Sequence, residues 1–229
     1  MKLETESGTW HEPFSPVIWE TQVPRKFIQI VNKVGDKVLS SDELSKQYDW
    51  SDNLAGKVWR ETAIPVNEEE GIYLKSVMKS KVCKYIEYLM DSNKIYNVKK
   101  RDNNKPELNI SPTSIDLTAS WLVSQYAGDY NPWHNHGGDF SSVIYLKMPP
   151  KLKEELKEEL KDHSPANGLI QFTYGETMDW KQDNLKFFPT VGAMLIFPAW
   201  LKHFVYPFYS DGERRSMSFN AKVNENFRL

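Results

Sequence analysis

The stretch from residue 131 to residue 146 constrains the fold more than any other part of the chain. It places His134 and His136 one residue apart and continues into a strongly apolar run that ends at Leu146. In an extended backbone, alternate side chains share a face, so both imidazoles point the same way. Two imidazoles on one face can bind one metal ion, and iron, zinc, copper and nickel all accept this ligand. The stretch therefore predicts extended backbone that carries a metal site.

A third histidine, His203, closes the other strongly apolar segment, which begins at Gly192. The chain has five histidines in all, and the other two, His11 and His163, lie in polar surroundings. Histidines can also serve as hydrogen-bonded structural residues. The placement of three of five at the edges of apolar strands favours a metal site formed by His134, His136 and His203.

Composition narrows the class of protein. The 229 residues carry 29 basic and 31 acidic side chains, so a basic excess for nucleic acid is absent and nucleic acid is disfavoured as a partner. The single cysteine, Cys83, excludes an internal disulfide and fits a reducing compartment. No apolar run approaches the ~20 residues that span a bilayer, and the N-terminus lacks a signal-peptide pattern. We therefore expect a cytoplasmic protein without a membrane partner.

The first half of the chain predicts helices. Pro24 opens one helical pattern, residues 40–43 form a capping box for a short helix, and Asn67 caps a longer helix. The longer helix has an apolar stripe that predicts a core-facing side: Leu74, Met78, Val82, Tyr85, Ile86 and Leu89. A short strand is expected within residues 57–64.

The second half predicts a β-rich region. Strands are expected at 118–127, 141–148, 168–174, 192–197 and 214–223, with a solvated helix at 151–161. We expect one domain of α+β or mainly β class, in which residues 1–108 form a mainly helical support region and residues 109–229 form the β core. A closed or sandwich-like sheet would bring distant strands, and so their histidines, together.

The strand at 214–223 opens with a second candidate site. If it is extended, Arg214 and Ser216 share a face while Arg215 points away. Guanidinium forms paired hydrogen bonds to carboxylates and stays charged. An arginine in such a pattern more often forms a surface salt bridge. Here Arg214 follows the candidate ligand His203 by 11 residues, which favours a carboxylate-binding site.

These segments together resemble the iron(II)- and 2-oxoglutarate-dependent oxygenases, in particular a branch found in bacteria and phages. The resemblance rests on His134-x-His136, on Ser142 to Leu146, on Gly192 to His203 and on Glu213 to Asn220, within roughly residues 110–222. It implies a double-stranded β-helix (jelly-roll) catalytic core over residues 109–229, with N-terminal helices packed against it. It also implies Fe(II), 2-oxoglutarate and O2, and hydroxylation of a substrate C–H bond with release of succinate and CO2. His134 and His203 would be iron ligands, and Arg214 with Ser216 would hold the distal carboxylate of 2-oxoglutarate.

The chain departs from the family at one ligand. Most of the superfamily has His-x-Asp at this place and so has a ligand set of two histidines and a carboxylate. Here His136 occupies the third position, and strand geometry favours it. Asp139 is the alternative, because the turn at residues 137 and 138 could bring its carboxylate back to the metal.

Other predictions concern the pocket. Tyr126, Trp133 and Tyr145 are candidate substrate-pocket residues, although aromatic side chains near strands more often belong to the core. Gln125 and Asn131 are candidates to hydrogen-bond the cosubstrate. Members of the family that the chain resembles act on free small molecules, on protein side chains and on nucleobases. The near-neutral charge disfavours nucleic acid, and the sequence does not choose between the other two.

A metal-binding or isomerase protein of the cupin type is the alternative function. Gly128 stands six residues before His134, as in the first cupin motif, but the usual glutamate is missing and Arg214 would have no role.

Overall fold

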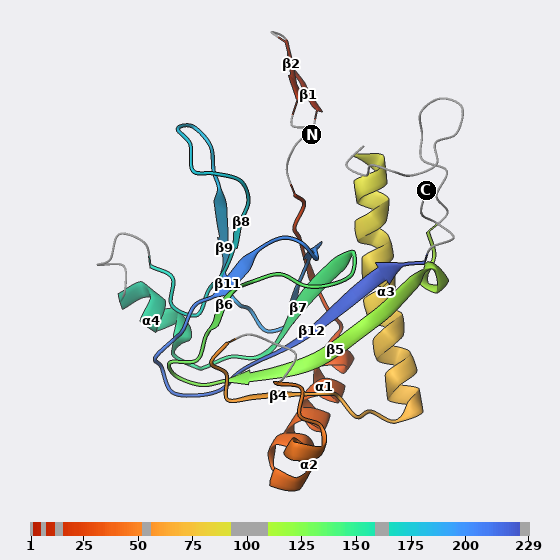
Figure 1. Ribbon diagram of the computed structural model, residues 1–229, viewed down its shortest axis with the longest axis vertical. Coiled ribbons are helices and arrows are strands. Elements are labelled where there is room, and N and C mark those ends of the chain that lie inside the picture. Colours follow the sequence, from red (N-terminus) through yellow and green to blue (C-terminus); the bar gives the residue numbers. More distant parts are fainter. Residues whose placement is uncertain are drawn as a thin grey trace.

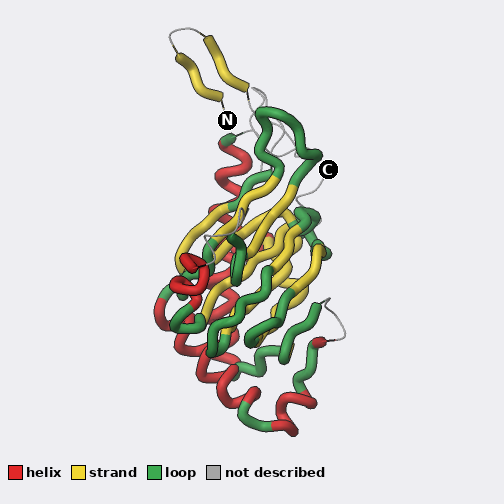
Figure 2. Tube along the Cα trace, turned by 90° about the vertical axis from the view of Figure 1, so that its left-hand side faces the viewer, coloured by secondary structure: helices red, strands yellow, loops and turns green. Residues whose placement is uncertain are grey.

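A computed structural model describes residues 2–5, 8–11, 16–51, 56–92, 110–158 and 165–224. The large sheet lies at its centre, with the longer helices along one side of it (Figures 1 and 2). In the described part of the chain, no helix is long and apolar enough to cross a membrane.

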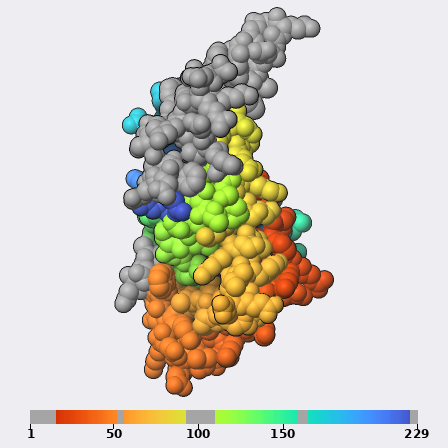
Figure 3. Space-filling model, turned by 90° about the vertical axis from the view of Figure 1, so that its right-hand side faces the viewer, coloured from red at the N-terminus to blue at the C-terminus, as the bar shows by residue number. Residues whose placement is uncertain are grey.

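Two long helices, α1 (Arg25–Leu39) and α3 (Glu68–Asp91), cover one face of the large sheet. Helix α3 begins where predicted, because the side chain of Asn67 accepts a hydrogen bond from the backbone nitrogen of Glu70 at 2.8 Å. All six residues of its predicted apolar stripe are buried. From the side, α3 and the segment that contains α2 (Asp42–Gln47) form much of the molecular surface (Figure 3). The cap of α2 is Ser41 rather than Ser40, so the predicted capping box starts one residue early.

The sheets are antiparallel throughout. One has six strands in the order β3-β10-β7-β12-β5-β4, another has four in the order β6-β11-β8-β9, and β1 pairs with β2. The strands of the six-stranded sheet are β3 (Trp19–Gln22), β10 (Ala193–Pro198), β7 (Phe140–Lys147), β12 (Arg214–Val223), β5 (Ile115–Gln125) and β4 (Arg60–Thr62). Those of the other two are β6 (Asn131–His134), β11 (His203–Val205), β8 (Ile170–Thr173), β9 (Asn184–Phe187), β1 (Lys2–Thr5) and β2 (Gly8–His11).

Apolar side chains fill both spaces beside the large sheet. Alternate residues of β7, β10 and β12 point to the helices, and the remaining ones point to the four-stranded sheet. Ile144, for example, packs with α1 and α3, whereas Val143 and Tyr145 pack with β8 and β11. Two layers of sheet with helices on one outer face place the space between the sheets at the centre of the molecule.

The predicted strands are present at all five places named from the sequence, and β12 has the predicted bounds. Helix α4 (Leu152–Glu158) covers the described part of the helix expected at residues 151–161. The short strands β9 and β11 had no separate prediction. Strands β3 and β4 precede residue 108 and yet form both edges of the large sheet. The division at residue 108 lies outside the described residues and stays a prediction.

Candidate metal and cosubstrate site

Three histidines meet in the space between the two sheets. His134 ends β6 and His203 begins β11, and the two are directly paired in the antiparallel register. His136 follows in a turn that is held by a hydrogen bond from its backbone nitrogen to the oxygen of Ala199 at 2.9 Å. Their potential ligand atoms all lie within 4.8 Å of one another, and the Nε2 atoms of His136 and His203 are 3.3 Å apart. The register of β6 and β11 thus brings together residues that are 69 positions apart.

Backbone carbonyls orient two of these rings. Nδ1 of His134 lies 2.7 Å from the oxygen of Pro132, and Nδ1 of His203 lies 3.0 Å from the oxygen of Leu201. A carbonyl oxygen only accepts, so in each ring Nδ1 carries the proton and donates it. The Nε2 lone pair of each ring is therefore free for a metal, which is the usual arrangement of ligand histidines.

Burial keeps the three imidazoles neutral. It lowers the pKa of His134, lowers that of His136 to about 4, and holds that of His203 well below its ordinary value. The neighbouring His134 adds to this effect at both His136 and His203. Neutral imidazole is the form that binds metal, and convergent lone pairs make an electron-rich point that suits a divalent cation. The donor set fits iron, because imidazole is a ligand that iron accepts.

Asp139, the alternative to His136, is engaged elsewhere. Its Oδ2 accepts a hydrogen bond from the backbone nitrogen of Val223, the last residue of β12, at 2.8 Å. Its own backbone joins Ala199 and Ala221 through hydrogen bonds. Among the described residues, the group that could hold a metal consists of the three histidines and does not include Asp139.

Arg214 is a buried cation beside this centre. Only 2% of the residue is exposed, and Nε and Nη1 have no hydrogen-bond partner in the described part of the chain. The guanidinium lies over the ring of Tyr145, 5.5 Å from its centroid, and the buried Tyr145 hydroxyl interacts electrostatically with it. Burial lowers the pKa of Arg214 and raises that of Tyr145. Unsatisfied polar atoms at this depth are costly, so they indicate a place for a ligand.

Arg215 has the opposite environment, as strand alternation requires. Its Nε and Nη2 donate to the two carboxylate oxygens of Glu213 at 2.7 and 2.9 Å, and Nη1 donates to Asp36 at 2.8 Å. Asp36 belongs to α1, so this side chain ties β12 to the helical layer. The carboxylate of Glu213 also accepts hydrogen bonds from Lys147 and Ser124.

The three histidines line one pocket, which encloses about 470 Å³ of space when the open solvent at its mouth is included. Gln125 and Asn131 line it and are joined by a hydrogen bond of 3.1 Å from Nε2 to Oδ1. Ser216 and Ser218 line it on the same face of β12 as Arg214. The apolar part of the lining surrounds the metal site: Trp121, Val123, Val143, Ile170, Phe197 and Val205.

Three aromatic candidates have different positions. Tyr145 is buried behind Arg214. Tyr126 and Trp133 are 39% and 47% exposed and pack on Trp59 and Phe204, respectively, and the pocket lining does not include them. Their role as substrate-pocket residues stays a prediction.

Sequence patterns did not point to Glu61, a buried carboxyl that lines the same pocket from β4. It lies in a short, polar segment of the first half without a motif. Only the pairing of β4 with β5 brings it to the site.

Comparison with known proteins agrees with these features. Residues 119–220 match a family model described as "Putative 2OG-Fe(II) oxygenase". The match contains all three histidines and Arg214. No curated protein matches the chain by sequence.

Two solved structures share the fold. The prolyl hydroxylase from Trichoplax adhaerens, solved with a peptide fragment of the hypoxia inducible factor oxygen degradation domain, has a TM-score of 0.54 at 13% identity. The alignment covers 93% of this chain and 85% of that one. AviO1 from Streptomyces viridochromogenes Tue57 has a TM-score of 0.52 at 13% identity, over 93% of this chain and 91% of that one. The fold is thus a double-stranded β-helix, as expected.

Proposed function

We propose that this chain works as a 2OG-Fe(II) oxygenase of the hydroxylase type, which its match to the family model over residues 119–220 supports, and we propose the residues that carry its reaction. His134, His136 and His203 would hold Fe(II), and Arg214 would hold the distal carboxylate of 2-oxoglutarate. The prime substrate would enter from the open side of the same pocket. The observation that carries this proposal is the buried guanidinium of Arg214, whose Nε and Nη1 have no hydrogen-bond partner among the described residues and which lines the pocket together with the three histidines.

The three histidines act through their orientation. The carbonyls of Pro132 and Leu201 hold two rings with Nε2 facing the centre, so little reorganisation accompanies metal binding. Trp121 packs on His136 at 5.5 Å between ring centroids and limits the rotation of the third ring. Bound Fe(II) supplies the redox chemistry in which O2 converts 2-oxoglutarate to succinate and CO2 while a substrate C–H bond becomes C–OH.

Arg214 and its neighbours orient the cosubstrate. A carboxylate beside the guanidinium would accept a hydrogen bond from Nε or from Nη1, which lie on different edges of the group, and the Tyr145 hydroxyl would add a further hydrogen bond. Ser216, one alternation further along β12, lines the same wall. With the distal carboxylate fixed there, the keto-acid end of 2-oxoglutarate would extend toward the histidines. The paired amides of Gln125 and Asn131 offer hydrogen bonds along this path.

The apolar lining excludes water from the reacting groups. Phe197 and Phe172 pack on His203 at 5.0 and 5.5 Å between ring centroids, and His203 is 3% exposed. A low-polarity surrounding strengthens the charge pairing at Arg214 and protects a reactive centre from side reactions.

The experiment is an assay for succinate with the full chain, Fe(II), 2-oxoglutarate and O2. We expect slow succinate formation even without a prime substrate, because the decarboxylation half-reaction needs only these components. His203→Ala should abolish it by removing a metal ligand, and Arg214→Ala should suppress it by weakening cosubstrate binding. Binding of 2-oxoglutarate and of metal, measured without O2, provides a second readout. A protein that binds neither 2-oxoglutarate nor metal would contradict the proposal.

A further inference from the structure

Glu61 is a buried carboxyl whose charge the protein does not balance. It is 2% exposed, and its Oε1 has no hydrogen-bond partner in the described ranges. The other two buried acidic residues of those ranges are satisfied. Asp129 accepts hydrogen bonds from the backbone nitrogens of Trp59 and Tyr126 at 2.9 Å, and Glu213 is paired with Arg215. Burial of a carboxylate without a hydrogen-bond donor costs free energy of folding. The position of Glu61 therefore indicates a role in binding a ligand.

The sheet register places Glu61 on the wall of the pocket. Glu61 is directly opposite Val123, which is opposite Ser216, which is in turn opposite Tyr145 on β7. Directly paired residues in an antiparallel sheet project to one face, so this row lies on the pocket side. Strands lie ~4.8 Å apart, and three steps put Glu61 about 14 Å from Tyr145 along the row. The pocket therefore has an anchor for an anion at Arg214 and a lone carboxyl toward the β4 edge.

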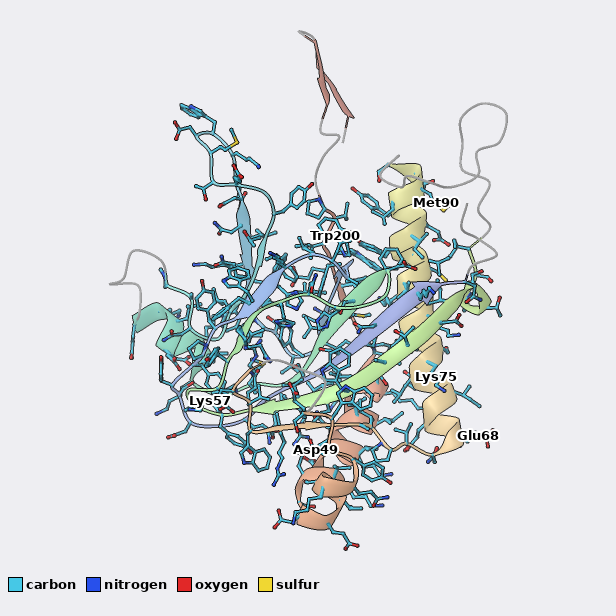
Figure 4. The ribbon with its side chains drawn as sticks, viewed as in Figure 1. Asp49, Lys57, Glu68, Lys75, Met90 and Trp200 are labelled. Carbon is cyan, nitrogen blue, oxygen red and sulfur yellow. The ribbon has the colours of Figure 1, made fainter. Side chains whose placement is uncertain are left out.

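Nearby basic groups do not supply the missing counter-charge. Arg60 precedes Glu61 on β4 and so projects to the other face. Its guanidinium lies 3.7 Å from Asp42 and packs over Trp59. Asp49 lies across from β4, with a bridge to Thr62, and carries the same charge as Glu61 (Figure 4). Burial, and to a smaller degree Asp49, raises the pKa of Glu61 to about 7.

We propose that Glu61 is a specificity residue that binds a protonated amine of the prime substrate. The proposal rests on the oxygenase function given above. Arg214 would be neutralised by the cosubstrate carboxylate, and Glu61 would be neutralised by the substrate cation, so each buried charge acquires its partner when the ternary complex forms. The substrate class is then an alkyl amine, either a free small molecule or a lysine side chain of a peptide. Glu61 lies outside residues 119–220, so the matched family region does not include it.

The test compares amines with neutral compounds of the same shape. Binding of n-pentylamine and n-pentanol to the full chain, loaded with Fe(II) and 2-oxoglutarate without O2, is measured by ligand-observed NMR. A second arm uses the tripeptide Ala-Lys-Ala against Ala-norleucine-Ala and separates a peptide source from a free amine. We expect the amine of at least one pair to bind the wild type about thirtyfold or more tightly than its neutral match, as for a buried charge pair. Glu61→Gln should remove that preference.

Controls separate recognition from folding. Glu43→Gln on the exposed side of α2 should leave the amine preference intact. Thermal unfolding of Glu61→Gln checks that the variant is folded, and Glu61→Asp keeps the charge while it shortens the reach. Equal binding of amine and neutral compounds, or an amine preference that survives in Glu61→Gln, would refute the role of Glu61. Failure of 2-oxoglutarate to bind the wild type, with the amine preference intact, would refute the cosubstrate assignment instead.

Discussion

Replacing Arg214 by methionine is expected to stabilise the cosubstrate-free protein while it destroys cosubstrate binding. The wild-type guanidinium is buried, and two of its nitrogens lack partners among the described residues. Its lowered pKa has burial as the main cause, which reflects an environment that disfavours the charge. Methionine keeps an unbranched apolar chain and removes the charge. Replacement of poorly compensated buried charge by apolar side chains gains on the order of 1–3 kcal/mol in the free energy of unfolding.

The matched substitution Arg215→Met should have the opposite effect on stability. It would leave the 6%-exposed Glu213 with only Lys147 and Ser124, and it would break the ion pair to Asp36 on α1. Removing one partner of a buried ion pair typically costs about 3–5 kcal/mol. Two neighbouring arginines on one strand are therefore predicted to change the free energy of unfolding with opposite signs.

Urea denaturation of the wild type and both variants measures these free energies. For a chain of this size, each 1 kcal/mol also moves Tm by roughly 2–4 °C, which gives a second check. Titration with 2-oxoglutarate in the presence of metal and absence of O2 then measures affinity. Arg214→Met should lose about thirtyfold or more, since a buried charge-assisted pair is worth about 2–5 kcal/mol. Folded Arg215→Met should bind with near wild-type affinity.

Two results would refute these predictions for Arg214 and Arg215. If Arg214→Met destabilises the protein as much as Arg215→Met does, the Arg214 guanidinium has a partner in the free protein. If both variants lose 2-oxoglutarate affinity equally, strand alternation does not separate their roles.

Three further predictions concern single side chains. Glu61 has an ordinary pKa of 4.5 and a folded-state pKa of about 7, so wild-type stability falls as pH rises through this window and Glu61→Gln avoids the loss. By urea denaturation, the variant should gain ~3 kcal/mol over wild type near pH 8 and almost nothing near pH 4, and a pH-independent difference would contradict the pKa argument. Asp139→Asn should keep metal affinity, measured by anaerobic titration with Fe(II), because the amide oxygen can still accept from Val223; a large loss would restore Asp139 as ligand. His136→Ala should weaken Fe(II) binding strongly in the same titration, and wild-type affinity would exclude it from the ligand set.

Most of the element pattern follows from local sequence. Asn67 with three glutamates marks the start of α3, and its apolar stripe has helical spacing, so both could be read without tertiary knowledge. The alternation in β12 likewise separates Arg214 from Arg215. Short strands such as β11 could not be read in this way, because three residues carry too little periodicity and their pairing partners are distant in sequence.

Site residues could be predicted only where their type and their spacing in the sequence form a recognisable pattern. His134 and His136 lie close in sequence, and His203 closes a strongly apolar segment. Glu61 has no such signature, since its place in the pocket comes from a pairing between β4 and β5 that joins residues 62 positions apart. Tyr126 and Trp133 are partly exposed and lie outside the pocket lining, and their role in substrate binding stays a prediction.

The histidines and Arg214 stand on different sheets, and this has a consequence for how the enzyme tolerates change. His134 and His203 belong to the four-stranded sheet, and Arg214 belongs to the six-stranded one. The apolar layer between the sheets therefore sets the separation between the two groups that we propose as anchors of the cosubstrate. A methyl group added or removed at Leu195 would alter catalysis at a distance, without touching any reacting group. The packing of the interior would then set the geometry of the proposed site as well as the stability of the fold.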